Sequence, residues 1–412
     1  MVLCSAQGKP QVFLLFTYLS LWCWATNISI YVKAEIIYSL KPGDTLNATS
    51  DLCSERRTYC MSFYISYLSI YSKWNSDWVV WNANRNQPVD INSAVLSLNN
   101  SGVLKIESKF GEPIILYDSR QHSNNSNIVA TLLDTGNFVL LVFQKNIVWE
   151  SFDHPTDSLL PGMKLGVNHK TGHKWSLVSS ISDSIPASGP FSLEWEATRK
   201  ELVIKRREKV YWTSGKLMKN NRFKYIPGEN FKVEIVSNEE EEYFRYTAPN
   251  EELIIWTLFQ TGQLINREGG ESGDIARADV CNGYNTNGGC QRWGEVKIPA
   301  CRNPGDKFDS KRVYSNDNIL YNIENASYGI SDCQEMCWSN CSCFGFNYLY
   351  VINETGCVFL VSSKGLNIAS SGSDNFNILI QNPTDHKGMY NSNYYIAILI
   401  FPKIKMTDWK LA

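Results

Sequence analysis

Short runs of apolar and β-branched residues, separated by Gly, Asn, Asp and Ser, recur along the first part of the chain. Each run has the length of a strand, and no stretch with a helical period interrupts the series. The runs lie at residues 79–81, 94–98, 102–106, 114–117 and 137–142. Regular short strands divided by turn residues are typical of an all-β barrel, sandwich or prism. The pattern therefore predicts a β-rich domain here.

A second strand-rich unit follows over residues 161–280, where apolar and polar residues alternate with period two at 191–195, 201–205 and 231–236. The segment 149–166 lies between the two units. It combines the large apolar residues Trp149 and Phe152 with prolines and an Asp-rich turn pattern. It is predicted to form a rigid, aromatic-pinned corner between the two halves.

The composition changes at Cys281. Residues 281–318 are polar and Gly-rich, as expected of a loop region closed by cysteines. The cluster 333–343 has the spacing C-x3-C-x3-C-x-C with no nearby His, which disfavours zinc. No metal or cofactor is expected. The tail after residue 381 contains an apolar run at 394–401 that is too short to cross a bilayer.

The N-terminus has the pattern of a secretory signal peptide, predicted for residues 1–25. Lys9 precedes an apolar core at residues 12–24, which is too short to span a bilayer with ease. Seven N-x-S/T sequons agree with secretion and predict a glycan-coated protein. The candidate glycosylation sites are Asn27, Asn47, Asn99, Asn124, Asn325, Asn340 and Asn353.

Cysteine usage also indicates an oxidising compartment. Of 12 cysteines, Cys4 and Cys23 fall in the signal segment. An even number then remains, which predicts five disulfides. These residues are Cys53, Cys60, Cys281, Cys290, Cys301, Cys333, Cys337, Cys341, Cys343 and Cys357. Spacing alone leaves the partners of Cys281, Cys290, Cys301 and Cys341 open.

Charge and histidine content exclude other functional classes. The net charge of −2 favours neither nucleic acid nor an anionic membrane as a partner. The five histidines show no nucleophile–base pattern, so no catalytic residues are expected.

Three motifs resemble a known plant family. They are WESFDHPTDSLLPGMKLG at 149–166, VVWNANR at 79–85 and TLLDTGNFVL at 131–140. The first is similar to a segment of S-locus glycoproteins and the ectodomains of S-domain (G-type lectin) receptor-like kinases, and the other two are similar to motifs of the bulb-type mannose-binding lectin domain. The resemblance implies a mainly β chain, with bulb-lectin β-prism domains followed by a small disulfide-rich α+β PAN/apple domain. It also implies a lectin domain at 35–160, a second lectin-like or S-locus glycoprotein domain at 161–280, a linker at 281–318, the PAN/apple domain at 319–381 and a tail at 382–412.

The resemblance further implies three disulfides. PAN modules staple a short helix to a small sheet, which favours the bonds Cys333–Cys357 and Cys337–Cys343. Aligned with the lectin family, residues 52–54 and 59–64 fall on two successive strands. A two-residue turn at Arg56-Arg57 would place Cys53 opposite Cys60, within reach of a disulfide.

The family's sugar pockets use the motif Q-x-D-x-N-x-V-x-Y, which this chain keeps poorly. In the second repeat these places fall on Leu98, Asn100, Gly102, Leu104 and Ile106, and in the third on Leu133, Thr135, Asn137, Val139 and Leu141. Asn100, Asn137 and Val139 are thus the remnants of a degenerate sugar motif. Apolar replacements leave sugar hydroxyls unpaired at about 1–3 kcal/mol each, which predicts strand core rather than a mannose pocket.

The sequence therefore predicts an extracellular recognition module. It would be the ligand- or partner-binding ectodomain of an S-domain receptor-like kinase, or a secreted truncated form of one. Expected partners are an extracellular ligand or co-receptor protein, with a glycan or a second copy as further candidates. The alternative is a mannose-binding lectin with a degenerate site. The kinase motifs are absent, so this chain is not expected to be an enzyme. The expected location is extracellular, or the plasma membrane if a longer product carries a transmembrane helix.

Overall fold

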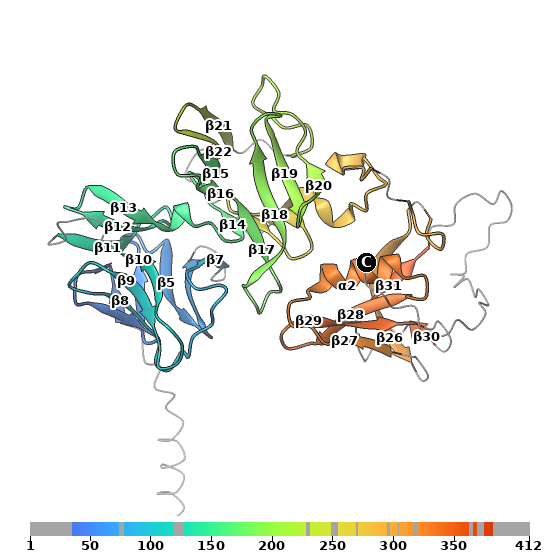
Figure 1. Cartoon of the computed structure of the whole chain (residues 1–412), viewed down its shortest axis with the longest axis horizontal. Helices are drawn as coiled ribbons and strands as arrows, with labels where there is room; N and C mark the ends of the chain where they lie inside the picture. The colour runs from blue at the N-terminus through green and yellow to red at the C-terminus, as the bar shows by residue number, and fades with distance from the viewer. Residues whose placement is uncertain are drawn as a thin grey trace, which may run out of the picture.

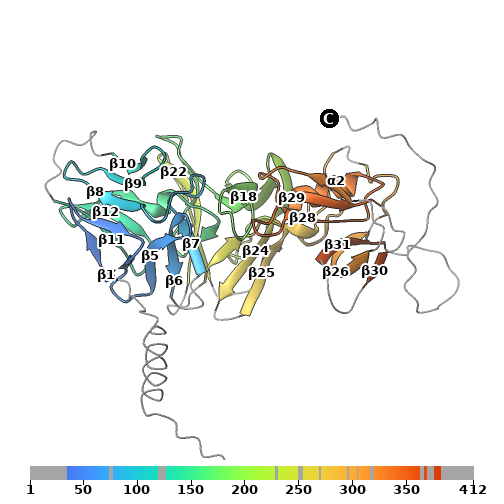
Figure 2. The same cartoon turned by 90° about the horizontal axis from the view of Figure 1, so that it is seen from below.

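The computed structural model describes residues 35–73, 78–118, 127–227, 231–248, 254–268, 271–294, 297–303, 305–315, 320–361, 366–368 and 375–381. The described chain is mainly β, as the sequence predicts. Three bodies follow one another in chain order and form an elongated row (Figures 1 and 2). The first two are β-prisms of three sheets each, and the third is a small α+β domain.

The first prism contains one five-stranded and two four-stranded sheets. The five-stranded sheet contains β1 (Glu35–Ile37), β4 (Ser50–Cys53), β5 (Tyr59–Tyr64), β6 (Tyr67–Ser72) and β7 (Trp78–Asn82). The second sheet contains β10 (Ile114–Tyr117), β9 (Leu104–Glu107), β8 (Val95–Leu98) and β3 (Thr45–Asn47). The third contains β13 (Asn146–Glu150), β12 (Phe138–Val142), β11 (Ile128–Leu132) and β2 (Ser39–Leu40).

The second prism repeats this plan with three four-stranded sheets. The first contains β14 (Ser158–Leu159), β23 (Trp256–Leu258), β24 (Gln263–Glu268) and β25 (Glu271–Arg277). The second contains β16 (Lys174–Trp175), β15 (Leu165–Asn168), β22 (Glu241–Thr247) and β21 (Lys232–Ser237). The third contains β17 (Leu177–Ser180), β18 (Ser188–Glu196), β19 (Glu201–Arg206) and β20 (Lys209–Thr213).

The third domain packs the helix α2 (Ile330–Ser339) on a six-stranded sheet. Its strand order is β27 (Leu320–Ile323), β29 (Thr355–Leu360), β28 (Gly345–Tyr350), β31 (Asn375–Ile380), β26 (Lys307–Ser315) and β30 (Leu366–Ile368). The helix begins at Ile330, just before the cysteine cluster, and buries Cys333 and Cys337, which lie one turn apart on its inner face. Arg302 fixes the other end of the helix by donating to the carbonyls of Cys337 and Asn340 at 2.8 and 2.9 Å.

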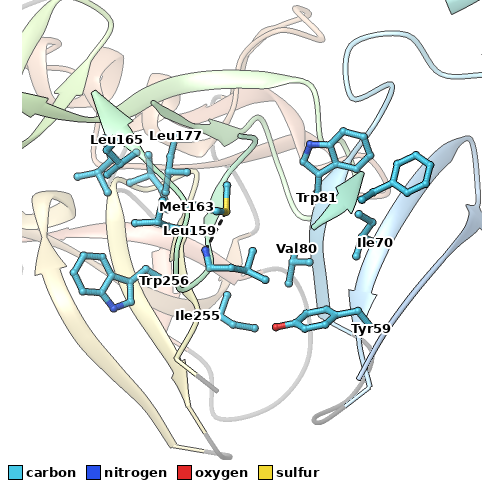
Figure 3. Packing of buried hydrophobic residues seen from close by; sticks show 14 of the residues in the cluster. Tyr59, Ile70, Val80, Trp81, Leu159, Met163, Leu165, Leu177, Ile255 and Trp256 are labelled. Carbon is cyan, nitrogen blue, oxygen red and sulfur yellow. Dashed lines mark hydrogen bonds between the residues drawn. The ribbon is translucent and has the colours of Figure 1, made fainter. Parts of the chain in front are cut away.

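The segment 149–166 forms the predicted corner between the prisms. It continues from β13 into a short 3-10 helix, η2 (Ser151–Asp153), and then into β14. Trp81 Nε1 donates to the His154 carbonyl at 2.7 Å, and Trp175 Nε1 donates to Asp153 Oδ1 at 2.8 Å. Figure 3 shows Val80 and Trp81 of the first prism facing Leu159 and the residues of the second prism across one continuous core.

The Gly-rich segment after β25 packs against the second prism. It includes the 3-10 helices η4 (Ala278–Val280) and η5 (Asn287–Gly289). Trp212 Nε1 donates to the Gly288 carbonyl at 2.7 Å, and Trp293 Nε1 donates to the Val210 carbonyl at 2.9 Å. This segment is therefore fixed on β20 rather than looping freely through solvent.

Candidate ligand-binding site

The remnant of the sugar motif in the third repeat is part of the corner between the prisms. Asn137 is buried, and its amide donates to Glu150 Oε2 at 2.5 Å. Its Oδ1 accepts from Ser151 Oγ and from the Phe152 amide, both at 3.2 Å. Val139 is fully buried, whereas Leu133 is exposed. Because Asn137 already uses both ends of its amide inside the protein, it holds η2 in place and has no free group for a sugar.

In the second repeat, the predicted register is wrong by one residue. Leu98, Leu104 and Ile106 all point into the core with no exposed surface. The Gly102 amide bonds to the Asn99 carbonyl, as the Gly136 amide bonds to that of Leu133, so the two turn glycines are equivalent. Asn100 therefore matches Asp134 rather than a motif position. Both glycines have a positive φ, a backbone conformation that residues with a side chain rarely adopt. These two positions therefore fix the register.

The same turn occurs in the second prism, where it was not predicted from the sequence. The Gly262 amide bonds to the Phe259 carbonyl at 2.9 Å, and the Phe259 amide bonds to the Gln263 carbonyl at 2.8 Å. Leu258 pairs with Leu264, as Leu132 pairs with Phe138 in the first prism. The sequence signal was available, since TGQ at 261–263 matches TGN at 135–137. By this register, Phe259 stands at the Gln position of the sugar motif and Arg267 at its Tyr position.

This repeat borders a cleft of about 530 Å³ between the two prisms. The wall from the first prism comes from β6, β7 and the β5–β6 turn, and includes Tyr64, Ile65 and Trp78. The opposite wall comes from the second prism, with β17, the turn after it, β23 and the following turn. Tyr64 is 67% exposed and Trp78 is 42% exposed, so the rim presents aromatic side chains to solvent.

Arg267 lies inside this cleft between two aromatic rings. Its guanidinium carbon is 3.6 Å from the centre of the Trp78 ring and 4.9 Å from that of Phe259. Its Nε is buried and has no hydrogen-bond partner. Burial lowers the pKa of Arg267 to about 10, so the guanidinium still carries its charge at neutral pH.

Two carboxyl groups also line the cleft. Burial raises the pKa of Asp157, while the Arg85 charge acts in the opposite direction. Arg85 itself donates to the carbonyls of Val178 and Ser179, both at 2.9 Å, and this ties β17 to the first prism. Asp183 accepts from Gln260 Nε2 at 3.2 Å, but the buried Gln260 Oε1 has no hydrogen-bond partner.

The third domain is attached next to the cleft by charged contacts. Arg206 donates to Asp332 Oδ1 at 2.6 Å and also pairs with Glu335, while Arg207 reaches the same Asp332 oxygen at 2.8 Å. Ser182 Oγ donates to the Asn353 carbonyl at 2.8 Å. The turn 182–187 thus lines the cleft on one side and contacts the third domain on the other.

All ten cysteines outside the signal segment are paired. The bonds Cys53–Cys60, Cys333–Cys357 and Cys337–Cys343 are those that the sequence predicted. The open partners pair as Cys281–Cys290 and Cys301–Cys341. The connection in the Cys53–Cys60 hairpin is longer than the predicted two-residue turn, because β4 ends at Cys53 and β5 begins at Tyr59. The two cysteines remain opposite, since the loop adds an even number of residues.

Five of the seven sequons lie in the described residues. Asn47 and Asn353 are exposed, and Asn99, Asn325 and Asn340 are half-buried. Asn99, Asn325 and Asn340 each accept a backbone amide two residues later, so their side chains also shape turns. Asn27 and Asn124 lie outside the described residues, as does the tail 382–412.

Comparisons with known proteins agree with this architecture. A D-mannose binding lectin family model matches residues 78–180, and a PAN-like domain model matches residues 301–363. A G-type lectin S-receptor-like serine/threonine-protein kinase of Arabidopsis thaliana is 29% identical over 75% of this chain and 39% of its own length. An S-locus-specific glycoprotein of Brassica oleracea is 26% identical over 70% of this chain and 77% of its own length.

The chain is a homologue of the G-type lectin S-receptor-like kinases and S-locus glycoproteins. It has their lectin and PAN-like domains, and no kinase domain is detected in it. It spans 22% to 46% of the length of the curated G-type lectin kinases compared. A monomeric mannose-binding lectin of Gastrodia elata is 22% identical, with a TM-score of 0.23, over 28% of this chain and 94% of its own. In the described residues, no helix has the length and hydropathy of a membrane span.

Proposed function

We propose that this S-domain chain is an extracellular recognition module that binds a ligand or a partner protein in the cleft between its two prisms. The observation that supports the proposal is the pair of buried polar atoms in the cleft, Arg267 Nε and Gln260 Oε1, which have no partner. Leaving such atoms desolvated and unpaired costs free energy, about 1–3 kcal/mol each. A ligand that bonds to them recovers that cost.

The alternative function, a mannose-binding lectin, has less support. The motif asparagine of the third repeat is already bonded inside the protein, and the motif positions Leu133 and Leu141 carry no hydrogen-bonding group. A glycan array separates the two functions. Selective mannose binding that survives Arg267→Ala but is lost in a Thr135→Ala variant would favour the lectin.

Secretion is part of the same proposal and has its own test. The chain is expressed in plant cells with its own N-terminus, and the culture medium is analysed. We expect a secreted product whose mass falls on glycosidase treatment and whose ten mature cysteines resist thiol reagents until reduction. A cytosolic product with reactive thiols would overturn the proposal. If a longer product carries a membrane helix, the same module would face the outside of the plasma membrane.

A further inference from the structure

The cleft between the prisms offers one unpaired donor and one unpaired acceptor. Arg267 Nε is the donor, held between the rings of Trp78 and Phe259. Gln260 Oε1 is the acceptor, on a side chain that is only 8% exposed. A ligand that satisfies both must present a hydrogen-bond acceptor and a hydrogen-bond donor a short distance apart. A peptide backbone and its side chains do this in every residue.

The walls of the cleft also suit an extended chain. On β17, the Val178 amide and the Val178 and Ser179 carbonyls are already bonded to Thr156 and Arg85. On the opposite wall, β7 is the edge strand of its sheet and lines the cleft. Edge strands present backbone groups to which an added strand can bond. The rim carries Ile65 and Val79, which are 57% and 37% exposed. Aliphatic side chains of a ligand would find contacts there that a sugar would not use.

The residues at the sugar-motif positions of the second prism favour a peptide over a sugar as the ligand. In this second-prism repeat, Phe259 stands in place of the motif Gln, and Arg267 stands in place of the motif Tyr. A sugar pocket needs several neutral donors and acceptors around one ring. Here the aromatic Phe259 occupies one polar position of the motif, and the cationic Arg267 occupies another. The strongest hydrogen-bond partner of an arginine is a carboxylate.

The charges in the cleft limit how acidic a ligand can be. Asp157 and Asp183 lie in the same cleft as Arg267. Both carboxyl groups already act electrostatically on the Arg267 guanidinium. One ligand carboxylate would find a cation, whereas a second would meet two carboxyl groups. Like-charge repulsion of this kind excludes competing ligands.

We propose that the cleft binds an extended peptide segment with a single carboxylate, which bonds to Arg267 while a peptide N–H donates to Gln260 Oε1. A neighbouring aliphatic or aromatic residue of the peptide rests on Tyr64 and Ile65 at the rim. This inference rests on the proposed recognition function and names the ligand class for its site.

The test selects short random peptides on the immobilised secreted protein and then measures synthetic peptides by fluorescence anisotropy. Each selected peptide is made in its acidic form and with the acid replaced by the amide, Asp→Asn or Glu→Gln. We expect the amide form to bind at least about tenfold more weakly, because a charged hydrogen bond is lost. Arg267→Ala should weaken the acidic form by a similar factor and leave the amide form nearly unchanged.

Arg199→Ala is the matched control, because Arg199 is a half-exposed arginine at the far end of the second prism's β18–β19 hairpin. It should leave both peptide forms unaffected, and the thermal midpoint of each variant verifies its fold. Equal binding of the acidic and amide forms, or selection of no peptide, would overturn the inference. Glycan binding that Arg267→Ala abolishes would also overturn it, but would leave the proposed recognition function standing.

Discussion

The joint between the two prisms is apolar and aromatic, whereas the joint between the second prism and the PAN-like domain is charged. The first, here called the corner joint, centres on Trp81, Trp149 and Leu159. The second, here called the PAN joint, centres on Arg206, Arg207 and Asp332. Burial of apolar surface is non-directional, but a buried ion pair depends on each partner. The prisms should therefore behave as one unit, with the PAN-like domain attached by a few specific bonds.

Removing the main aromatic side chain of the corner joint should have the largest effect. Trp81 is 4% exposed, contacts the Trp149 ring and bonds to the His154 carbonyl. Trp81→Ala is expected to lower the free energy of unfolding by about 3–5 kcal/mol, as for other buried large-to-small changes. Urea unfolding followed by tryptophan fluorescence measures this. Phe110→Ala in the first prism is the control and should cost less than about 1 kcal/mol, because Phe110 is 67% exposed. Equal losses in the two variants would contradict the apolar joint.

Removing the carboxylate of the PAN joint should have the next largest effect. Asp332 is 2% exposed, and Asp332→Asn leaves the buried Arg206 with Glu335 alone. We expect a loss of about 3 kcal/mol, because a buried charge loses its buried partner. Limited proteolysis in urea measures the unfolding of the PAN-like domain and so gives this loss of stability. Glu234→Gln breaks an exposed pair with Arg245 and should cost under about 1 kcal/mol. A comparable loss in both variants would refute the charged joint.

The corner joint could be predicted from sequence, but the PAN joint could not. Trp149 and Leu159 lie within one short segment, whose prolines, aromatics and turn residues act locally, although Trp81 joins them only in the fold. Arg206 and Asp332 are far apart in sequence, and nothing in either neighbourhood marks them as partners. The cleft was missed for a similar reason, since Trp78 and Arg267 meet only after both prisms form. The misplaced register at Leu98–Ile106 had a different cause: the turn glycine, not the apolar pattern, fixes which residues face the core.

A smaller effect is expected from removing Asn137, the polar side chain that holds η2 in the corner joint. Asn137→Ala removes the bonds to Glu150, Ser151 and Phe152 and leaves the half-buried Phe152 amide without its acceptor. A loss of about 2 kcal/mol is expected, within the usual cost of an unsatisfied buried group. Thermal unfolding measures it, with Asn100→Ala as control, since Asn100 is exposed and off the motif face. If the control loses as much, the assignment of Asn137 as a structural residue is wrong.

The smallest effect is a pH dependence confined to the corner joint. The His154 ring stacks on Trp149 and contacts His173 edge-on. Burial lowers the pKa of His154, the His173 charge acts in the same direction, and Asp153 opposes them. Because folding favours the neutral ring, the stability that His154 contributes is fully present above the unfolded pKa of about 6.5 and is lost as the pH falls towards the lower folded pKa.

The thermal midpoint of the wild type should therefore fall further between neutral and mildly acidic pH than that of His154→Gln. His169→Gln changes an exposed histidine in the β15–β16 connection and should behave like wild type. Parallel pH profiles for wild type and His154→Gln would show that the corner joint, unlike the PAN joint, contains no titrating contact that matters to its stability.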